Sequence, residues 1–168
     1  MKSTILQEKQ KIGKYIVQSH IIDGPFNESY CVQDETGILY FLKIFDLKRV
    51  PSKIVNSDSI INEINYCEKI CHKNVVNFVE KGVYSQGDEN FPYFITKFVH
   101  GNLVADPLSK GRIFPLQMSM EIIKNILQGL SHIHSIGLIH NDITPRNIIY
   151  NPKDLSQTTL IDLGHVSK

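Results

Sequence analysis

Two segments in the last third of the chain concentrate carboxylate and amide side chains. The first, His140–Asn147, contains Asp142 and Asn147, and the second begins at Asp162. Two carboxylates and an amide on adjacent tight loops can share one or two magnesium ions, because hard cations take oxygen ligands. One such loop alone is usually only a solvated turn. Two of them in sequence favour a metal-binding site.

A lysine and a glutamate in the first half form a second candidate pair. Lys43 lies in the apolar run Tyr40–Ile44, where a lone charge is costly without a partner. Glu63 lies inside a helical pattern at 60–71 and can supply the opposite charge. Most strand lysines and helix glutamates are simply exposed charges. The pairing of Lys43 with Glu63 is therefore supported mainly by the motifs that follow in the sequence.

Runs of β-branched and aromatic residues predict the strands that would carry Lys43. Turn residues at Asp34–Gly37 and a polar loop at 85–90 separate neighbouring runs, and Ser57–Ser59 supplies capping side chains for the helix of Glu63. We expect a five-stranded antiparallel sheet with one helix. The expected strands are Tyr15–Ile22, Ser29–Gln33, Ile38–Phe45, Val75–Tyr84 and Phe91–Val99.

The pattern changes beyond His100–Asn102 to one broad apolar helix stripe. It predicts a mostly buried helix over about 118–136 that ends at Gly137, followed by short apolar runs between polar loops. The fold class is therefore α+β, with the sheet first and a helical part second. The stripe consists of Ile122, Ile123, Ile126, Leu127, Leu130 and Ile133.

Composition restricts the class of protein. The chain has 168 residues, 42% of them hydrophobic, and a formal net charge of +1, which provides no overall field to attract nucleic acid or an anionic membrane. No run is long enough to span a bilayer. Three cysteines are too few for a disulfide framework, so a cytoplasmic protein with reduced thiols is expected. Cys67 and Cys71 share the helix stripe and are predicted to pack in the core rather than bind metal.

The motifs resemble those of the protein kinase superfamily. His140–Asn147 is similar to the catalytic loop H-R-D-x-x-x-x-N, and Asp162-Leu163-Gly164 is similar to D-F-G. Lys43 falls where the lysine of V-A-I-K stands, Glu63 follows on the next helix, and His72–Val76 resembles the H-x-N-I-V segment after that helix. The resemblance runs from about Lys14 to Lys168.

This resemblance implies ATP and Mg²⁺ as cofactors and a protein Ser or Thr hydroxyl as the acceptor. Asp142 would accept the hydroxyl proton, and Asn147 and Asp162 would hold magnesium. Lys43, paired with Glu63, would contact the α- and β-phosphates. The residues expected around the rest of the nucleotide are Gly24 in the phosphate-covering loop, Thr96 as gatekeeper, and Lys97, Phe98 and Val99 as the hinge that meets adenine.

Three departures from the family pattern bear on activity. The glycine-rich loop keeps only Gly24 of three glycines, and Pro25 removes a backbone donor. Asn141 replaces the arginine that receives an activation-loop phosphate, so control by such a phosphate is not expected. As part of this second departure, Thr144 stands where a lysine is usual, and Arg146 can replace part of that charge.

The third departure is the absence of the A-P-E segment and of later helices that complete the large lobe in the family. We therefore expect an N-terminal extension at 1–13, an N-lobe at 14–96, a hinge at 97–102 and a partial C-lobe at 103–168. The uncovered helix face predicts self-association, a partner chain or poor solubility. The alternatives to a protein kinase are a pseudokinase or nucleotide-binding regulatory module, and a small-molecule kinase resembling aminoglycoside phosphotransferases.

Overall fold

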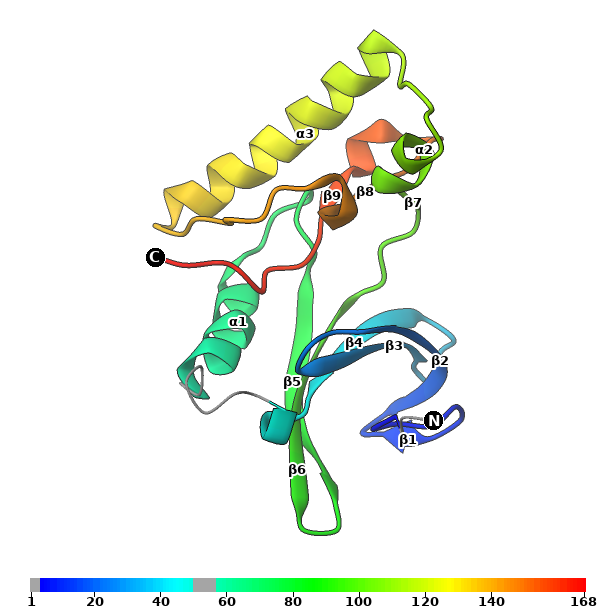
Figure 1. The fold of residues 1–168 in the computed structure, drawn as a ribbon, viewed down its shortest axis with the longest axis vertical. Coiled ribbons are helices and arrows are strands. Elements are labelled where there is room, and N and C mark those ends of the chain that lie inside the picture. Colours follow the sequence, from blue (N-terminus) through cyan, green and yellow to red (C-terminus); the bar gives the residue numbers. More distant parts are fainter. Residues whose placement is uncertain (1–3, 50–56) are drawn as a thin grey trace. The chain divides into compact units, whose positions relative to one another are not determined.

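The first half of the chain forms a six-stranded antiparallel sheet (Figure 1). The computed structural model describes residues 4–49 and 57–168. The sheet has the order β1-β2-β3-β4-β6-β5, and the first strand was not among the five expected from the sequence. The strands are β1 (Lys11–Ile12), β2 (Tyr15–Asp23), β3 (Asn27–Gln33), β4 (Leu39–Phe45), β5 (Phe78–Gln86) and β6 (Glu89–Lys97).

The turn between β3 and β4 shows how local chemistry sets the sheet register. Asp34 Oδ1 accepts hydrogen bonds from the backbone N–H groups of Thr36, at 2.9 Å, and Ile38, at 3.0 Å. Gly37 adopts φ of 87°, which a residue without Cβ does at little cost. The turn aligns Ser29 opposite Lys43.

The N-terminal segment is part of this unit's core. Ile5, Leu6 and Ile12 are buried in the same apolar cluster as Tyr30 and other residues of the sheet, and β1 pairs with β2. Residues 1–13 were expected to be an extension ahead of the fold. The described part of that segment packs with the sheet in one apolar cluster and adds to the apolar area that the cluster buries.

A buried carboxylate joins the N-terminal segment to β3. Glu28 is 1% exposed and accepts hydrogen bonds from Ile5 N–H at 2.7 Å and from the Tyr30 hydroxyl at 2.5 Å. Arg49 Nη2 lies 2.9 Å from Glu28 Oε1, and its Nε lies 2.9 Å from Asp46 Oδ2. Burial raises the pKa of the Tyr30 phenol, so this hydroxyl stays a donor to the carboxylate.

The chain divides into two compact units. One comprises Met1–Ile64 with Phe78–Phe98, and the other comprises Asn65–Asn77 with Val99–Lys168. Helix α1 (Ser57–Lys69) contributes residues to both. It ends two residues before Cys71, which is exposed, so the prediction that Cys71 packs in the core is wrong; Cys67 is buried as expected.

The second unit combines two further helices with a small sheet of order β7-β8-β9. Its elements are β7 (Asn102–Leu103), α2 (Ala105–Ser109), α3 (Leu116–Ser135), β8 (Ile148–Tyr150) and β9 (Thr159–Leu160). Helix α3 ends as the sequence predicts, with Gly137 at φ of 74°. Gly137 N–H donates to His134 O and Leu138 N–H donates to Ile133 O, a Schellman arrangement that satisfies the last carbonyl groups.

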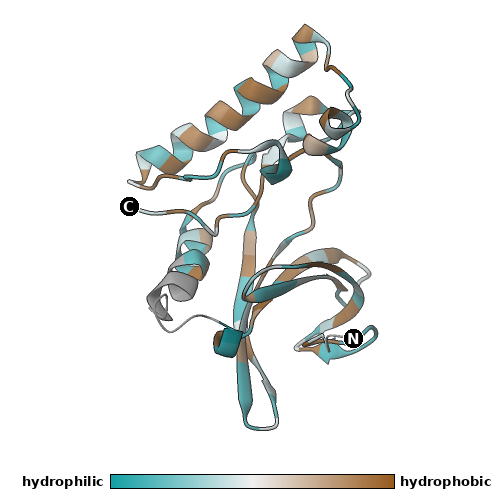
Figure 2. Cartoon of the chain, viewed as in Figure 1, coloured by the Kyte–Doolittle hydropathy of each residue, from teal (hydrophilic) through white to brown (hydrophobic). Residues whose placement is uncertain are grey.

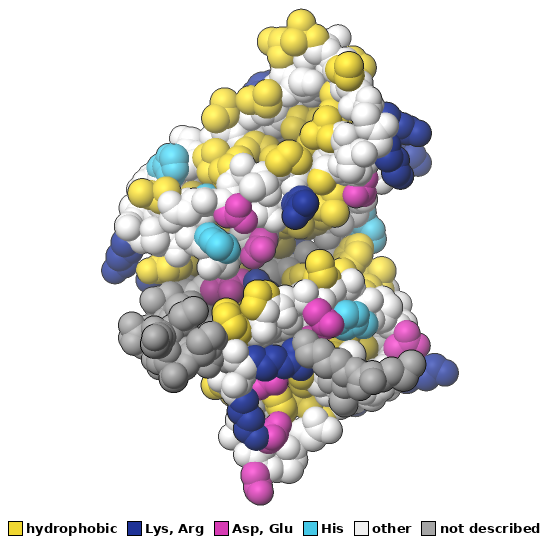
Figure 3. Space-filling view, in the orientation of Figure 1, with side chains coloured by type: hydrophobic (Ala, Val, Ile, Leu, Met, Phe, Trp, Pro, Cys, Tyr) yellow, Lys and Arg dark blue, Asp and Glu magenta, His cyan; other side chains and the backbone are white. Residues whose placement is uncertain are grey.

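Helix α3 is less buried than its sequence suggests. Ile122, Ile126 and Ile133 are buried, but Ile123 and Leu127 are 57% and 58% exposed. The apolar residues recur along α3 in Figure 2, and hydrophobic side chains gather over it in Figure 3. The expectation of a mostly buried helix is therefore wrong for half of its stripe. No helix in the described residues is both long and apolar enough to cross a membrane.

The segment before β5 is held inside the second unit by a buried amide. Asn74 Nδ2 donates to Thr158 O at 2.7 Å and to Ser156 O at 3.0 Å, and Asn74 O accepts from Leu160 N–H at 2.8 Å. Val75 bridges to Leu160, so β5 begins only at Phe78 rather than at Val75 as expected. The buried amide of Asn74 therefore satisfies two backbone carbonyl groups of the segment before β9.

The buried Glu28 network generates a stability prediction. Glu28→Ala leaves the guanidinium of Arg49 and two other donors without their acceptor, so the free energy of unfolding should fall by about 3 kcal/mol. Urea unfolding followed by circular dichroism measures it. The control is Glu35→Ala, at an exposed turn position, with an expected change within about 0.5 kcal/mol. Equal stabilities of the two variants would contradict the role assigned to the network.

A pH dependence follows from His140, which is 1% exposed. Burial lowers its pKa from 6.5, while Asp162 and Asp142 oppose the shift. The unfolded chain therefore binds the proton first, so stability is full above pH 6.5 and is lost as the pH falls from there through the lowered pKa. Urea unfolding between about pH 7.5 and about pH 5.5 should show a shallower loss for His140→Gln than for the parent. His134→Gln, at an exposed position of α3, should keep the parent's slope, and identical slopes in all three proteins would refute the assignment.

Candidate functional site

Strand β4 carries a lysine that is paired inside the first unit. Lys43 Nζ lies 2.6 Å from Glu63 Oε1, and the two side chains are only 12% and 8% exposed. The ammonium also lies 5.7 Å from the centre of the Phe45 ring. Sequence analysis expected these two residues to be partners, and the structure places them in contact. Burial of both charges makes the pair depend on each partner being present.

The face of the sheet that carries Lys43 also carries the predicted gatekeeper. Lys43 is opposite Ser29 and Phe94, and Thr96 is opposite Phe41, so these side chains share one face. Thr96 is 2% exposed, and its Oγ1 has no hydrogen-bond partner within the part of the chain that the structure describes. A buried hydroxyl without a partner can form a hydrogen bond with a polar group of a ligand.

The predicted hinge spans the boundary between the two units. Lys97 is exposed at the end of β6, and Phe98 is half-buried as the last residue of the first unit. Val99, also half-buried, is the first residue of the following segment of the second unit. The three hinge candidates are therefore consecutive in a connection between units.

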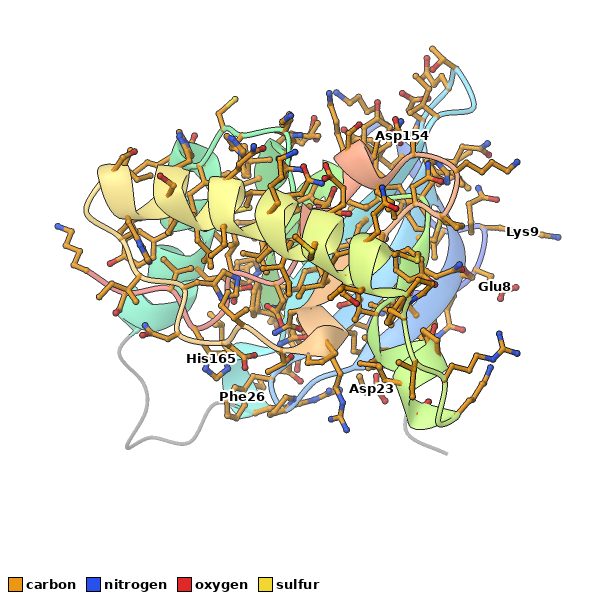
Figure 4. All side chains as sticks on the ribbon, turned by 90° about the horizontal axis from the view of Figure 1, so that it is seen from above. Glu8, Lys9, Asp23, Phe26, Asp154 and His165 are labelled. Atoms are coloured by element: carbon orange, nitrogen blue, oxygen red, sulfur yellow. The ribbon has the colours of Figure 1, made fainter. Side chains whose placement is uncertain are left out.

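The turn that contains Gly24 is closed by its own backbone. Asp23 and Phe26, labelled in Figure 4, flank the pair Gly24-Pro25 on this turn between β2 and β3. Gly24 N–H donates to Asn27 O at 2.8 Å, and a Cβ on Gly24 would lie 2.6 Å from Asn27 Oδ1. The N–H group of Gly24 is thus already hydrogen-bonded, and Pro25 has no N–H group to donate. The turn offers fewer free amides to phosphates than a three-glycine loop does.

The loop from His140 to Asn147 holds an aspartate and an asparagine together. Asn147 Nδ2 donates to Asp142 Oδ2 at 2.7 Å and to Asp142 O at 3.0 Å. Asn147 is 9% exposed and closes a single helical turn at Pro145–Asn147, with its N–H bonded to Thr144 O. Because its amide nitrogen faces Asp142, the amide oxygen is the part of Asn147 left to bind another group.

Asp162 adjoins this loop through the backbone. Ile161 N–H donates to Asn147 O at 2.8 Å, which brings the next residue, Asp162, beside Asn147. Asp162 has φ of 61°, and its Oδ1 accepts from Gly164 N–H at 3.1 Å. The buried ring of His140 feels the charges of both Asp142 and Asp162, which act to raise its pKa against the larger effect of burial. Both carboxylates therefore lie around one point of the second unit.

The oxygen ligands of this cluster suit magnesium. Asp142 and Asp162 supply carboxylates, and Asn147 supplies an amide oxygen. Magnesium in such sites is held by one or two carboxylates together with substrate phosphates, so a complete protein cage is not required. Among residues 4–49 and 63–168, whose side chains the structure describes, no group of three His, Cys, Asp or Glu side chains that could hold a metal occurs.

The predicted residues thus fall into two groups, each assembled within its own unit. Lys43, Glu63 and Thr96 belong to the first unit, and Asp142, Asn147 and Asp162 belong to the second. Glu28, which sequence reasoning missed, anchors the strand that leaves the Gly24 turn. The sequence feature that could have identified Glu28 is its alternation with Tyr30 and Val32, which places it on the same face of β3 as these buried residues.

The chain has relatives among known proteins. The family profile for the protein kinase domain matches residues 15–168. The chain is similar to a calcium/calmodulin-dependent protein kinase type 1 of Caenorhabditis briggsae, with 27% identity over 90% of this chain and 41% of that protein. It is also similar to the MAP kinase kinase kinase wis4 of Schizosaccharomyces pombe, with 32% identity over 82% of this chain and 10% of that protein.

A third relative is calcium-dependent protein kinase 4 of Plasmodium falciparum, 27% identical over 98% of this chain and 33% of that protein. The chain spans less than half the length of each of these relatives. The antiparallel sheet, the helix α1 and the partial helical second unit confirm the expected α+β fold. With the family profile covering most of its length, the chain belongs to the protein kinase domain family.

Proposed function

We propose that this chain is the nucleotide-binding and catalytic part of an enzyme that transfers a phosphoryl group from ATP to a Ser or Thr hydroxyl of a protein. The observation that supports this best is the contact of 2.7 Å between Asn147 Nδ2 and Asp142 Oδ2, beside the backbone bond that brings Asp162 to the same loop. This arrangement leaves carboxylate and amide oxygens available on one cluster.

The second unit supplies the proton acceptor and the metal ligands in this proposal. Asp142 accepts the proton of the substrate hydroxyl with the carboxylate that Asn147 orients. Asn147 Oδ1 and Asp162 bind Mg²⁺, which neutralises charge on the phosphates when it is bound. Orientation matters because a hydroxyl is a weak nucleophile unless its proton has an acceptor within hydrogen-bond reach.

The first unit and the three hinge candidates supply the phosphate and adenine contacts. Lys43, held by Glu63 at 2.6 Å, presents an ammonium to the α- and β-phosphates. Thr96 offers its unpaired hydroxyl beside the adenine, and the backbone of Lys97 to Val99 meets the base edge. The turn at Gly24 covers the phosphates, with affinity reduced because its amide is engaged by Asn27 O.

A nucleotide-binding regulatory module without useful turnover is the second candidate. The closed Gly24 turn favours it, because fewer free amides lower the stabilisation of the transferring group. A small-molecule kinase shares the Asp142 chemistry and differs only in the acceptor. We also infer a reducing, cytoplasmic setting from the three free cysteines, of which Cys71 is exposed.

Our next prediction concerns nucleotide binding, which is the first step in separating these functions. Millimolar ATP with magnesium should raise the melting temperature of the parent by several degrees, since a ligand of the native state stabilises by mass action. Lys43→Ala and Asp162→Ala should lose most of the rise. Lys153→Ala and Asp88→Ala remove matching charges at exposed positions and should keep it. Differential scanning fluorimetry provides the measurement, and a parent with no shift would exclude the nucleotide site.

Transfer is followed with radiolabelled ATP, in parallel samples that contain a generic protein substrate or an aminoglycoside. Asp142→Asn should keep the thermal shift but lose transfer by at least about a hundredfold, because it removes the proton acceptor. A thermal shift in the parent without any transfer would select the regulatory module. Label that appears on an aminoglycoside and not on protein would select the small-molecule kinase.

The exposed stripe on α3 generates a separate prediction about assembly. Leu116, Met120, Ile123 and Leu127 recur every three to four residues and are 57 to 77% exposed. We propose that this stripe associates with a second copy or a partner chain, because soluble monomers seldom expose such a patch. Light scattering should show association of the parent and relief of it in Ile123→Lys.

The matched control for this prediction is Gln128→Lys, which adds the same charge to α3 at an exposed position away from the stripe. It should associate as the parent does. A dye for apolar surface should report the stripe in any dissociated chain. A parent that stays monomeric and binds no dye over the whole accessible concentration range would refute the proposal.

A further inference from the structure

The segment after Asp162 is joined to the start of the catalytic loop. Ile139 N–H donates to Ser167 O at 2.8 Å, and Ser167 N–H donates to Ile139 O at 3.0 Å. These two bonds form an isolated antiparallel bridge within the second unit. The chain between the two contact points includes Asp142, Asn147 and Asp162.

Asn141 reinforces the bridge with its side chain. Its Nδ2 lies 3.0 Å from His165 O and 2.9 Å from Ser167 Oγ, so the two amide hydrogens have two acceptors on the same segment. Ile139 O is a more distant third neighbour at 3.4 Å. His165, labelled in Figure 4, belongs to this C-terminal stretch. The side chain therefore connects the catalytic loop to the segment that follows Asp162.

The backbone of Asn141 is arranged at a conformational cost. Its φ is 64°, a region that residues with a Cβ seldom occupy and that asparagine tolerates better than most. Asn141 is also exposed, so its hydrogen bonds compete with water. Backbone cost and solvent competition offset much of the stabilisation that these bonds provide. Global stability is therefore a poor explanation for the arrangement, and local positioning is a better one.

The contacts restrain Asp162 from both sides. On one side, Ile161 N–H is bonded to Asn147 O. On the other side, His165 and Ser167 are bonded to Asn141. Leu163, 3% exposed, anchors the intervening turn in the core. Asp162 is thus fixed relative to the loop that carries Asp142 and Asn147.

We propose that Asn141 is a positioning residue that holds Asp162 in register with the Asp142–Asn147 pair for binding of a divalent cation. This inference rests on the proposed function, since it concerns the same cation site. Asn141 replaces an arginine, and its neutral amide has no charge to attract a phosphate on a neighbouring residue. The amide holds the segment by direct hydrogen bonds, and the geometry is therefore independent of phosphorylation.

Two variants test the proposal. Asn141→Gly preserves the preference for positive φ and removes the amide, whereas Asn141→Asp keeps the shape and turns an oxygen toward two acceptors. Hydrogen exchange of the Ile139 and Ser167 amides reports the bridge directly. Electron paramagnetic resonance of Mn²⁺ titrated with ADP reports the cation site. We expect exchange about tenfold faster and Mn²⁺ binding about tenfold weaker in both variants, the loss equivalent to one good hydrogen bond.

The matched controls are Asn151→Gly and Asn151→Asp. Asn151 is an asparagine of the same unit whose Nδ2 donates to Gln157 Oε1 at 3.1 Å. Asp154, three residues further along, is well separated from His165 in Figure 4. These controls should keep the parent's exchange at Ile139 and Ser167 and its Mn²⁺ affinity. ADP affinity without metal should be the same in all variants, because Asn141 is assigned no nucleotide contact.

The outcomes distinguish this proposal from the proposed function. A parent that binds no Mn²⁺ with ADP would overturn both, and that failure appears without any variant. A parent that binds Mn²⁺ while Asn141→Gly and Asn141→Asp match it would overturn the positioning role alone. Faster exchange in the variants with unchanged Mn²⁺ affinity would also overturn it, because the amide would then hold the segment without affecting Asp162. Loss of both properties in the two Asn141 variants only would support it.

Discussion

A lysine inside an apolar sheet needs a carboxylate beside it, and much of the first unit follows from that requirement. Lys43 and Glu63 are both largely buried, and their contact of 2.6 Å ties β4 to α1. The attraction within a buried ion pair is largely offset by the cost of removing both charges from water, so such a pair adds little to the free energy of unfolding. Under the proposed function, the pair keeps an ammonium group at a fixed place on the sheet. Thr96 shares that face, so the unit presents a charged donor and an unpaired hydroxyl together.

The opposite face of the sheet also carries a buried charged group, the carboxylate of Glu28, with different partners. Glu28 lies on β3 next to Ser29, whose side chain faces the side of Lys43. Its carboxylate is satisfied by Arg49, Tyr30 and the backbone of Ile5. The N-terminal segment therefore serves as both apolar cover and hydrogen-bond donor. The segment before Tyr15 thus contributes both to the apolar cluster of the first unit and to the hydrogen bonds of Glu28.

Features set by neighbours in sequence were predictable, and features set by distant packing were not. The turn at Asp34–Gly37 and the helix end at Gly137 depend on residues within a few positions, so their side-chain chemistry could be read directly. The Asp142–Asn147 contact joins residues five apart in one loop and is similarly local. Strand β1, the Glu28 network and the exposure of Cys71 and Ile123 depend on which distant segment covers each face. Periodicity identifies an apolar stripe but does not identify the surface that covers it.

Two of the departures from the family pattern, at Gly24 and Asn141, have the same physical basis. At Gly24 a backbone amide is bonded within its own turn, and at Asn141 a neutral amide replaces a guanidinium. In both places a group that would respond to a bound phosphate is exchanged for a hydrogen bond made inside the protein. Such bonds need no phosphate, because both partners belong to the protein. The same exchange lowers the electrostatic contribution to phosphate binding, because a satisfied amide and a neutral side chain attract an anion less than free donors and a cation do. Under the proposed function, a fixed Asp162 and a modest affinity at the Gly24 turn would both follow from this one change in chemistry.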